Sequence, residues 1–297
     1  MSIRSLPEAR ASVPGLATLG LSALAMLAFA ANSLMCRVAL RGGHIDAAGF
    51  GALRLLAGAL MLVLVVMAGR RPDRRIAGDW RSAALLFVYV ACFAFAYVTL
   101  AAGTGALILF GAVQLTMCGA GLLRGERYAS GGWCGLALAA AGLVVLMLPG
   151  VSAPSLQGAV LMALAGAAWG GYSLRGRGVS DPAATTAGNF MRAVPLGLVP
   201  ALVFAAHLHA DAAGVLLALA SGALTSGLGY VIWYAALRGL TSLQAATLQL
   251  SVPLIAAGGG VLMLDEAVTA RLLLAAVAIL GGIALVLRAG KRGVAKA

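Results

Sequence analysis

The sequence predicts an all-α integral membrane protein whose ten transmembrane helices form two inverted five-helix repeats around a central cavity. Hydrophobic residues make up 62% of the 297 residues and charged residues only 10%, and the mean hydropathy is +1.00. This composition is far more apolar than a water-soluble protein requires. Long uncharged runs define the helices, and an internal repeat defines their arrangement.

Each long uncharged run is interpreted as one membrane span, because a bilayer core of roughly 30 Å takes about 20 helical residues to cross. The runs occupy residues 15–39, 47–68, 82–100, 102–123, 131–148, 158–174, 183–206, 212–237, 243–264 and 270–287. The connections between them are too short for a soluble catalytic or nucleic-acid-binding domain. We therefore expect a lipid bilayer around the protein and no nucleic-acid partner.

The first span also fits a signal peptide, because Arg4 and Arg10 precede an apolar run that reaches Ala28, Phe29 and Ala30. We expect it to be retained as a span. Its counterpart in the second half of the chain is internal, and the first repeat would be incomplete without it.

The basic residues predict the orientation. Most of the 21 Lys and Arg residues flank the spans on one side of the membrane, whereas Arg37, Arg41 and Arg271 lie on the other side. Because basic flanks are retained in the cytoplasm, we expect both termini to be cytoplasmic.

Two halves of the chain, residues 1–150 and 151–297, resemble each other. At an offset of 138 positions, residues 37–61 match residues 175–200, and Arg37 and Arg54 correspond to Arg175 and Arg192. Later matches are Gln114 with Gln249, Glu126 with Glu266, and 142–143 with 282–283. An odd number of spans in each half inverts the second copy, so the halves can open a shared site to either side in turn.

The same positions resemble EamA-type members of the drug/metabolite transporter superfamily. The pattern is an Arg in the second span of each half, a fourth span that ends in Glu, and a glycine-containing fifth span; the best stretches are 248–253, 264–266 and 279–282. The first half departs from the pattern: it has no counterpart of Pro253, and residues 114–126 form a shorter stretch than residues 249–266.

The resemblance implies ten helices in a five-plus-five inverted arrangement, with a cavity lined by the first, third, fourth, sixth, eighth and ninth spans. Within the superfamily, the chain is most similar to YddG-like exporters of aromatic amino acids. That similarity implies a bacterial plasma (inner) membrane location and an aromatic amino acid as the small-molecule substrate.

Aromatic residues form three stripes at helical spacing, where positions three or four apart share a face. The stripes are Tyr89, Phe93 and Tyr97; Trp169 and Tyr172; and Tyr230, Trp233 and Tyr234. A Tyr or Trp far from both membrane interfaces needs a polar partner, which a wet cavity provides. The stripes therefore indicate a substrate-binding surface, although ordinary packing or interfacial anchoring produces the same pattern.

Three amides fall on helices that the resemblance assigns to the cavity: Asn32, Gln114 and Gln249. Each can donate and accept hydrogen bonds, so each is a candidate to hold an amino or carboxylate group. Hydrogen bonding between helices is the equally good alternative.

Arg54 and Arg192 lie within spans, where a cation must pair, snorkel or face water. Because both halves carry the matching Arg, we favour a structural role, such as binding backbone carbonyls. Arg54 remains a second candidate for attracting a substrate carboxylate.

Chemistry-bearing groups are missing from the span interiors. All nine acidic residues lie in tails, connections or at span ends, and Cys36, Cys92, Cys118 and Cys134 lack metal-ligand spacing. No Walker-type loop is present. We therefore expect no enzyme activity, cofactor or bound metal.

These observations favour a transporter that exports small amphipathic metabolites by alternating access without ATP hydrolysis. The alternatives are an exporter of other amino acids, drugs or nucleotide-linked metabolites, and a non-transporting membrane scaffold, receptor or lipid-modifying enzyme. The oligomeric state is open, and a monomer is compatible with the sequence.

Overall fold

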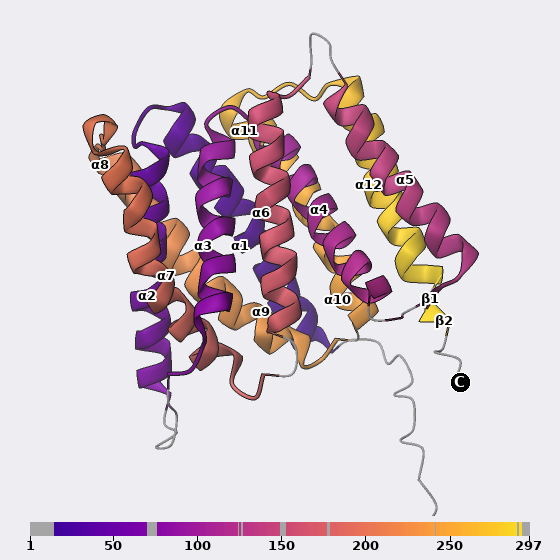
Figure 1. The fold of residues 1–297 in the computed structure, drawn as a ribbon, viewed down its shortest axis with the longest axis horizontal. Coiled ribbons are helices and arrows are strands. Elements are labelled where there is room, and N and C mark those ends of the chain that lie inside the picture. Colours follow the sequence, from indigo (N-terminus) through magenta and orange to yellow (C-terminus); the bar gives the residue numbers. More distant parts are fainter. Residues whose placement is uncertain are drawn as a thin grey trace, which may run out of the picture.

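A computed structural model describes residues 15–69, 76–123, 125, 127–148, 153–176, 179–240, 242–289 and 291–292. These residues are almost entirely helical (Figure 1). In order, the elements are α1 (Leu16–Arg41), α2 (Ala47–Ala68), α3 (Trp80–Tyr97), α4 (Ala102–Leu123), β1 (Arg127–Tyr128), α5 (Ser130–Met147), α6 (Leu156–Arg175), α7 (Pro182–Val203), η1 (Ala205–His207), α8 (Ala212–Ala220), η2 (Ser221–Leu228), α9 (Gly229–Leu237), α10 (Ser242–Gln249), α11 (Ser251–Leu264), α12 (Ala270–Ala289) and β2 (Lys291–Arg292).

Eight helices of the described ranges are long and apolar enough to cross a membrane. One of these is the continuous run of α8, η2 and α9, and another joins most of α10 to α11. The 20-residue α6 and the 22-residue α7 are outside this group. Polar residues such as Asn189 and Arg192 in α7 lower its apolar character, and both are matched to specific partners inside the bundle.

The helices run roughly side by side as a bundle (Figure 1). α5 and α12 pack together at one edge, while α2, α7 and α8 lie at the other. Between these edges, α3 and α4 both contact α6, and α1 contacts α9 and α11. Strands β1 and β2 pair antiparallel, with Arg127 opposite Arg292, below α5 and α12 in Figure 1.

Acidic residues at the predicted span ends cap helices. The side chains of Asp46, Asp79, Asp181 and Asp211 each accept a hydrogen bond from a backbone N–H in the first turn of α2, α3, α7 and α8. Such caps satisfy donors that have no partner within the helix. These four carboxylates therefore organise helix ends and stay out of the bundle interior.

Two helices lose regular α geometry near their middle. Residues Ser221–Leu228 form a π-helical segment. The helix formed by α10 and α11 is interrupted at Leu250, three residues before Pro253. A Pro lacks the N–H that the preceding turn would need, and π segments and interrupted membrane helices commonly occur at functional sites. Both irregular segments face the same internal pocket.

Candidate functional site

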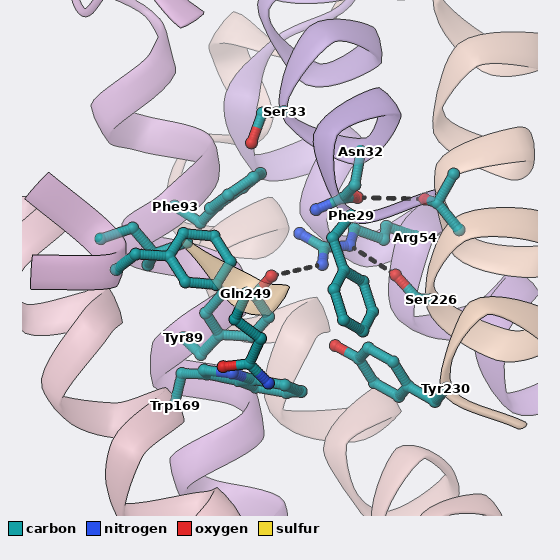
Figure 2. Close-up of a pocket in the computed structure, with 13 residues that line it drawn as sticks. Phe29, Asn32, Ser33, Arg54, Tyr89, Phe93, Trp169, Ser226, Tyr230 and Gln249 are labelled. Atoms are coloured by element: carbon teal, nitrogen blue, oxygen red, sulfur yellow. Dashed lines mark hydrogen bonds between the residues drawn. The ribbon is translucent and has the colours of Figure 1, made fainter. Parts of the chain in front are cut away.

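A pocket in the middle of the bundle is formed by α1, α2, α3, α4, α6, η2, α9 and α10 (Figure 2). Its cavity is about 30 Å³, measured as the space open to the centres of water molecules. A water needs roughly 10–15 Å³ by this measure, so the pocket has room for only a few waters. The lining residues are Phe29, Asn32, Ser33, Arg54, Tyr89, Phe93, Leu109, Phe110, Trp169, Thr225, Ser226, Tyr230 and Gln249.

Arg54 is the charged residue of this lining and is only 1% exposed. Its Nε donates to Ser226 Oγ at 3.1 Å, and its Nη2 donates to Tyr89 Oη at 3.0 Å. The guanidinium carbon lies 5.1 Å from the ring centre of Tyr89 and 4.9 Å from that of Phe93. The third nitrogen, Nη1, has no hydrogen-bond partner among the described residues.

Close backbone packing holds Arg54 beside η2. A Cβ on Gly222 would collide with the backbone carbonyl of Arg54 and would lie 2.8 Å from Ala57 Cβ. On the facing helix, a Cβ on Gly58 would lie 3.2 Å from Gly222 O. Glycine at both positions therefore allows α2 and η2 to approach until Ser226 reaches the Arg54 side chain.

Trp169 is the centre of an aromatic cluster. Its ring lies 4.9 Å from that of Tyr89 and 5.1 Å from that of Tyr230, measured between centroids. It also stacks on Tyr172 at 5.5 Å with an interplanar angle of 23°. Phe29 contacts Tyr230 edge-on at 6.0 Å. These rings give the pocket a broad apolar wall (Figure 2).

The two amides of the pocket differ in their partners. Asn32 Oδ1 accepts hydrogen bonds from Ser221 Oγ at 2.7 Å and Thr225 Oγ1 at 3.3 Å. The single Thr225 hydroxyl hydrogen is shared with Ser221 O at 2.8 Å, so Ser221 is the main donor to Asn32, and the Asn32 nitrogen is left for the pocket (Figure 2). Gln249 is the last residue of α10, directly before the helix break, and its side chain lines the pocket (Figure 2).

Seven of the thirteen candidate residues line this pocket: Asn32, Arg54, Tyr89, Phe93, Trp169, Tyr230 and Gln249. Tyr97 is fully buried below Gly105 and donates its hydroxyl to Ala102 O at 3.2 Å. Gln114 lies further along α4, and Trp233 packs edge-on against Phe29, with ring centroids 6.0 Å apart; neither residue lines the pocket.

Arg192 makes different contacts from its sequence match Arg54. Its Nη1 donates to Ala77 O at 3.1 Å and to Gly188 O at 2.9 Å, which joins the segment before α3 to α7. The two matching arginines are therefore unequal: Arg192 binds backbone carbonyls, and Arg54 faces the pocket.

Tyr172 and Tyr234 line a second cavity of about 60 Å³, by the same measure, between α3, α6, α7 and α9. Asn189 organises its wall, because its Oδ1 accepts from Asp79 N at 3.0 Å and its Nδ2 donates to Tyr172 Oη at 3.3 Å. At the rim, Arg175 Nη2 lies 2.9 Å from Asp79 Oδ1. Trp169 lines the central pocket and Tyr172 lines the second cavity, so their stacked rings lie between the two.

Six lining residues were missed by the sequence analysis: Phe29, Ser33, Leu109, Phe110, Thr225 and Ser226. Phe29, Leu109 and Phe110 look like any lipid-facing or core residue in an apolar run, so no signal distinguishes them. Thr225 and Ser226 carried a signal, because 221–227 is the most concentrated run of Ser, Thr and Gly in its span.

At the end of the bundle where α1 meets the α3–α4 and α11–α12 connections, Arg37 and Glu266 form an ion pair with Nε and Oε1 3.0 Å apart. Arg37 Nη1 also donates to the carbonyls of Tyr97 and Val98, and Arg41 donates to Leu264 O. These contacts tie α1 to the two connections at that end of the bundle.

No group of three or more His, Cys, Asp or Glu side chains gathers as a metal site within the described ranges. Together with the helices, the pocket defines a multi-pass membrane protein that encloses an aromatic and polar cavity.

Comparison with known proteins identifies the family. The EamA-like transporter family matches residues 156–288. The "Uncharacterized protein PA1977" of Pseudomonas aeruginosa is 56% identical over 275 residues, which cover 93% of this chain and 96% of that protein. A crystal structure, described only as that of a protein, superposes with a TM-score of 0.65 over 92% of this chain and 96% of its own, at 20% identity, and this likeness concerns the fold alone. The chain belongs to the EamA-like transporter family.

Proposed function

We propose that the protein exports small amphipathic metabolites, above all aromatic amino acids, across the bacterial inner membrane. The observation that carries this proposal is the position of Trp169, whose ring contacts those of both Tyr89 and Tyr230 in a pocket that also presents Arg54 and Asn32. Rings stack on rings, and the polar groups suit the charged end of an amino acid.

The proposed organisation is ten spans in two inverted repeats, residues 1–150 and 151–297, with both termini in the cytoplasm. Helix packing supports it. α2 packs on α7, α4 on α11, and α5 on α12, and each of these pairs joins matched helices of the two halves. α1 corresponds to α6, and α3 corresponds to the run that contains α9. The contact of α3 with α6 is therefore equivalent to the contact of α9 with α1, as a two-fold axis between the halves requires.

The proposed mechanism is alternating access without ATP hydrolysis. In this orientation the Arg37–Glu266 pair closes the outer end, and the second cavity beside Tyr172 and Tyr234 lies toward the cytoplasm. An aromatic substrate is larger than the present central cavity, so loading must separate the stacked rings of Trp169 and Tyr172. We propose that Tyr172 and Tyr234 bind the substrate on its way to the central pocket, and that Tyr97, Gln114 and Trp233 contact it only after the helices move.

Reconstitution tests the proposal. Purified protein in liposomes is assayed for uptake of tryptophan, phenylalanine, threonine and a cationic dye, with and without a proton gradient. We expect tryptophan and phenylalanine to move faster than threonine and the dye. The absence of flux for every amino acid in the panel contradicts the proposal.

A further inference from the structure

Arg54 is a buried cation without a counter-ion. No Asp or Glu belongs to the pocket lining as the structure describes it, and the Glu266 carboxylate is already engaged by Arg37 and by Ala102 N at 2.7 Å. Among the described residues, Arg54 Nη1 lacks a hydrogen-bond partner, whereas Nε and Nη2 each donate one hydrogen bond. A charge in a low-dielectric interior is strongly destabilising unless something neutralises it, so this position favours the arrival of an anion.

The groups around Arg54 are arranged as donors. Tyr89 Oη and Ser226 Oγ accept from Arg54, which directs their own hydrogens away from the guanidinium. The oxygen of Asn32 accepts from Ser221 Oγ at 2.7 Å, which leaves its NH₂ group. A carboxylate accepts hydrogen bonds only, and this set of donors matches it.

The same arrangement disfavours an organic cation. An ammonium group binds carboxylates or the open faces of aromatic rings. Here the Arg54 guanidinium already lies over the rings of Tyr89 and Phe93, 5.1 and 4.9 Å from their centres. A second cation beside them would be repelled by the Arg54 charge, which lacks the screening of bulk water.

We propose that Arg54 Nη1, with Asn32 Nδ2 and the Tyr89 hydroxyl, forms a carboxylate site, and that the substrates are aromatic carboxylates with or without an α-amino group. The proposal rests on the proposed function and narrows it. The carboxylate lies against Arg54 while the ring occupies the wall formed by Trp169 and Tyr230. Aromatic amines without a carboxylate are excluded.

A ligand series on the wild-type protein separates these groups. Tryptophan, indole-3-propionate (no amine) and tryptamine (no carboxylate) are tested for thermal stabilisation of the detergent-solubilised protein and for competition with tryptophan uptake in liposomes. Tryptophan and indole-3-propionate should act at similar concentrations. Tryptamine should be about ten- to a hundred-fold weaker, the loss expected for a charge-assisted hydrogen bond. Equal action by tryptamine overturns the proposal.

Simple carboxylates test the site independently of tryptophan transport. Benzoate and hexanoate should stabilise the protein, and hexylamine should not. This result is expected even if no amino acid is transported. The absence of amino-acid transport would then overturn the proposed function but not the carboxylate site. In a parallel arm, chloride is added to a buffer that contains neither chloride nor a carboxylate. If chloride gives the full stabilisation and carboxylates add nothing to it, the site is an inorganic-anion site and the proposal is wrong.

Arg54→Gln tests the assignment to this residue, with Arg288→Gln as the matched control at the exposed end of α12. The benzoate concentration needed for half-maximal stabilisation should rise about ten-fold or more in Arg54→Gln and remain unchanged in Arg288→Gln. Retention of the full effect in folded Arg54→Gln contradicts the proposal. Should Arg54→Gln not fold, the wild-type series above decides the question.

Discussion

Glu266 joins three separate segments through one carboxylate. Its Oε1 pairs with Arg37 Nε at 3.0 Å, and its Oε2 accepts from Ala102 N at 2.7 Å. Arg37 in turn binds the carbonyl of Tyr97 at 2.9 Å. The C-terminal end of α1, the α3–α4 connection and the α11–α12 connection therefore meet at this side chain, which closes one end of the bundle.

Glu266→Gln should loosen this end of the bundle. An uncharged amide pairs less strongly with Arg37, which leaves a partly buried guanidinium less well satisfied, a change worth roughly 1–3 kcal/mol. Cys36, the fully buried neighbour of Arg37, should become more reactive toward a membrane-impermeant maleimide in a protein whose other cysteines are replaced by Ala. Unchanged labelling relative to the Cys36-only parent would show that Glu266 does not hold this end closed.

Arg192→Ala should reduce stability without altering substrate preference. The change removes two hydrogen bonds to backbone carbonyls, those of Ala77 and Gly188, and should lower the free energy of unfolding by about 1–3 kcal/mol. Thermal unfolding in detergent measures the loss, and the ratio of tryptophan to threonine uptake measures preference. Arg192→Lys should recover part of the stability, because Lys keeps the positive charge and its amino group can still donate to one of the two carbonyls. A change in preference at normal stability would place Arg192 in the substrate path.

Gly222→Ala should push η2 away from α2. The added Cβ would collide with Arg54 O and Ala57 Cβ. Neither atom can turn aside, because the first belongs to the helix backbone and the second is bonded directly to it. Over-packing of this kind typically costs about 1–3 kcal/mol, and here it would also separate Ser226 from Arg54. The matched control is Gly258→Ala in α11, where no described atom outside the local helix backbone lies within 4 Å of the added Cβ. Equal stability and transport of the two variants would contradict the close packing.

Acid should weaken the cap of α3. Partial burial of Asp79 opposes its ionisation, but hydrogen bonds from Ser82 and the neighbouring Arg175 outweigh burial and hold the pKa of Asp79 below its ordinary value. The resulting stabilisation is complete above the ordinary carboxyl range, near pH 4, and disappears as the pH falls through the lower pKa of the folded state.

Asp79→Asn tests this dependence. The variant should be less stable than wild type at neutral pH, by about 1 kcal/mol or less for such an exposed group, and the two proteins should converge in acid. Unfolding curves across the acidic range measure the difference. Asp265→Asn is the control, since it removes an exposed carboxylate at a φ of 51° that Asn also tolerates. A difference from wild type that stays constant with pH would contradict the assignment.

The sequence predicted most helix positions well, since burial in a bilayer requires long apolar runs. Residues 47–68 and 102–123 match α2 and α4 at both ends. The π segment was not predicted, because it depends on packing across helices, such as Gly222 against Arg54. The break at Leu250 lies next to Pro253, which the sequence does indicate as a position where a helix can kink. An α-helical stripe places Tyr89, Phe93 and Tyr97 on one face. Only the neighbouring helices decide that Tyr97 is sealed beneath Gly105 while Tyr89 faces the pocket.

The internal repeat helped to predict the roles of only some of the site residues. Matching residues suggested equal roles for Arg54 and Arg192, yet the first faces the pocket and the second binds carbonyls. Trp169 has no aromatic counterpart in the first half, where Ala31 lies at the matching position. The repeat alone did not identify the pocket, because Arg54 and Gln249 are matched positions that line it, and Trp169 is a departure that also lines it.

Tryptophan counterflow in liposomes with Trp169→Ala, compared with Trp133→Ala, tests the central claim most directly. Trp133 lies exposed on α5, so its loss controls for the removal of a Trp from the protein surface. We expect Trp169→Ala to lower tryptophan exchange by about ten-fold, the usual effect of removing a central aromatic anchor, and Trp133→Ala to behave as wild type. Wild-type exchange by folded Trp169→Ala would contradict transport through the central pocket.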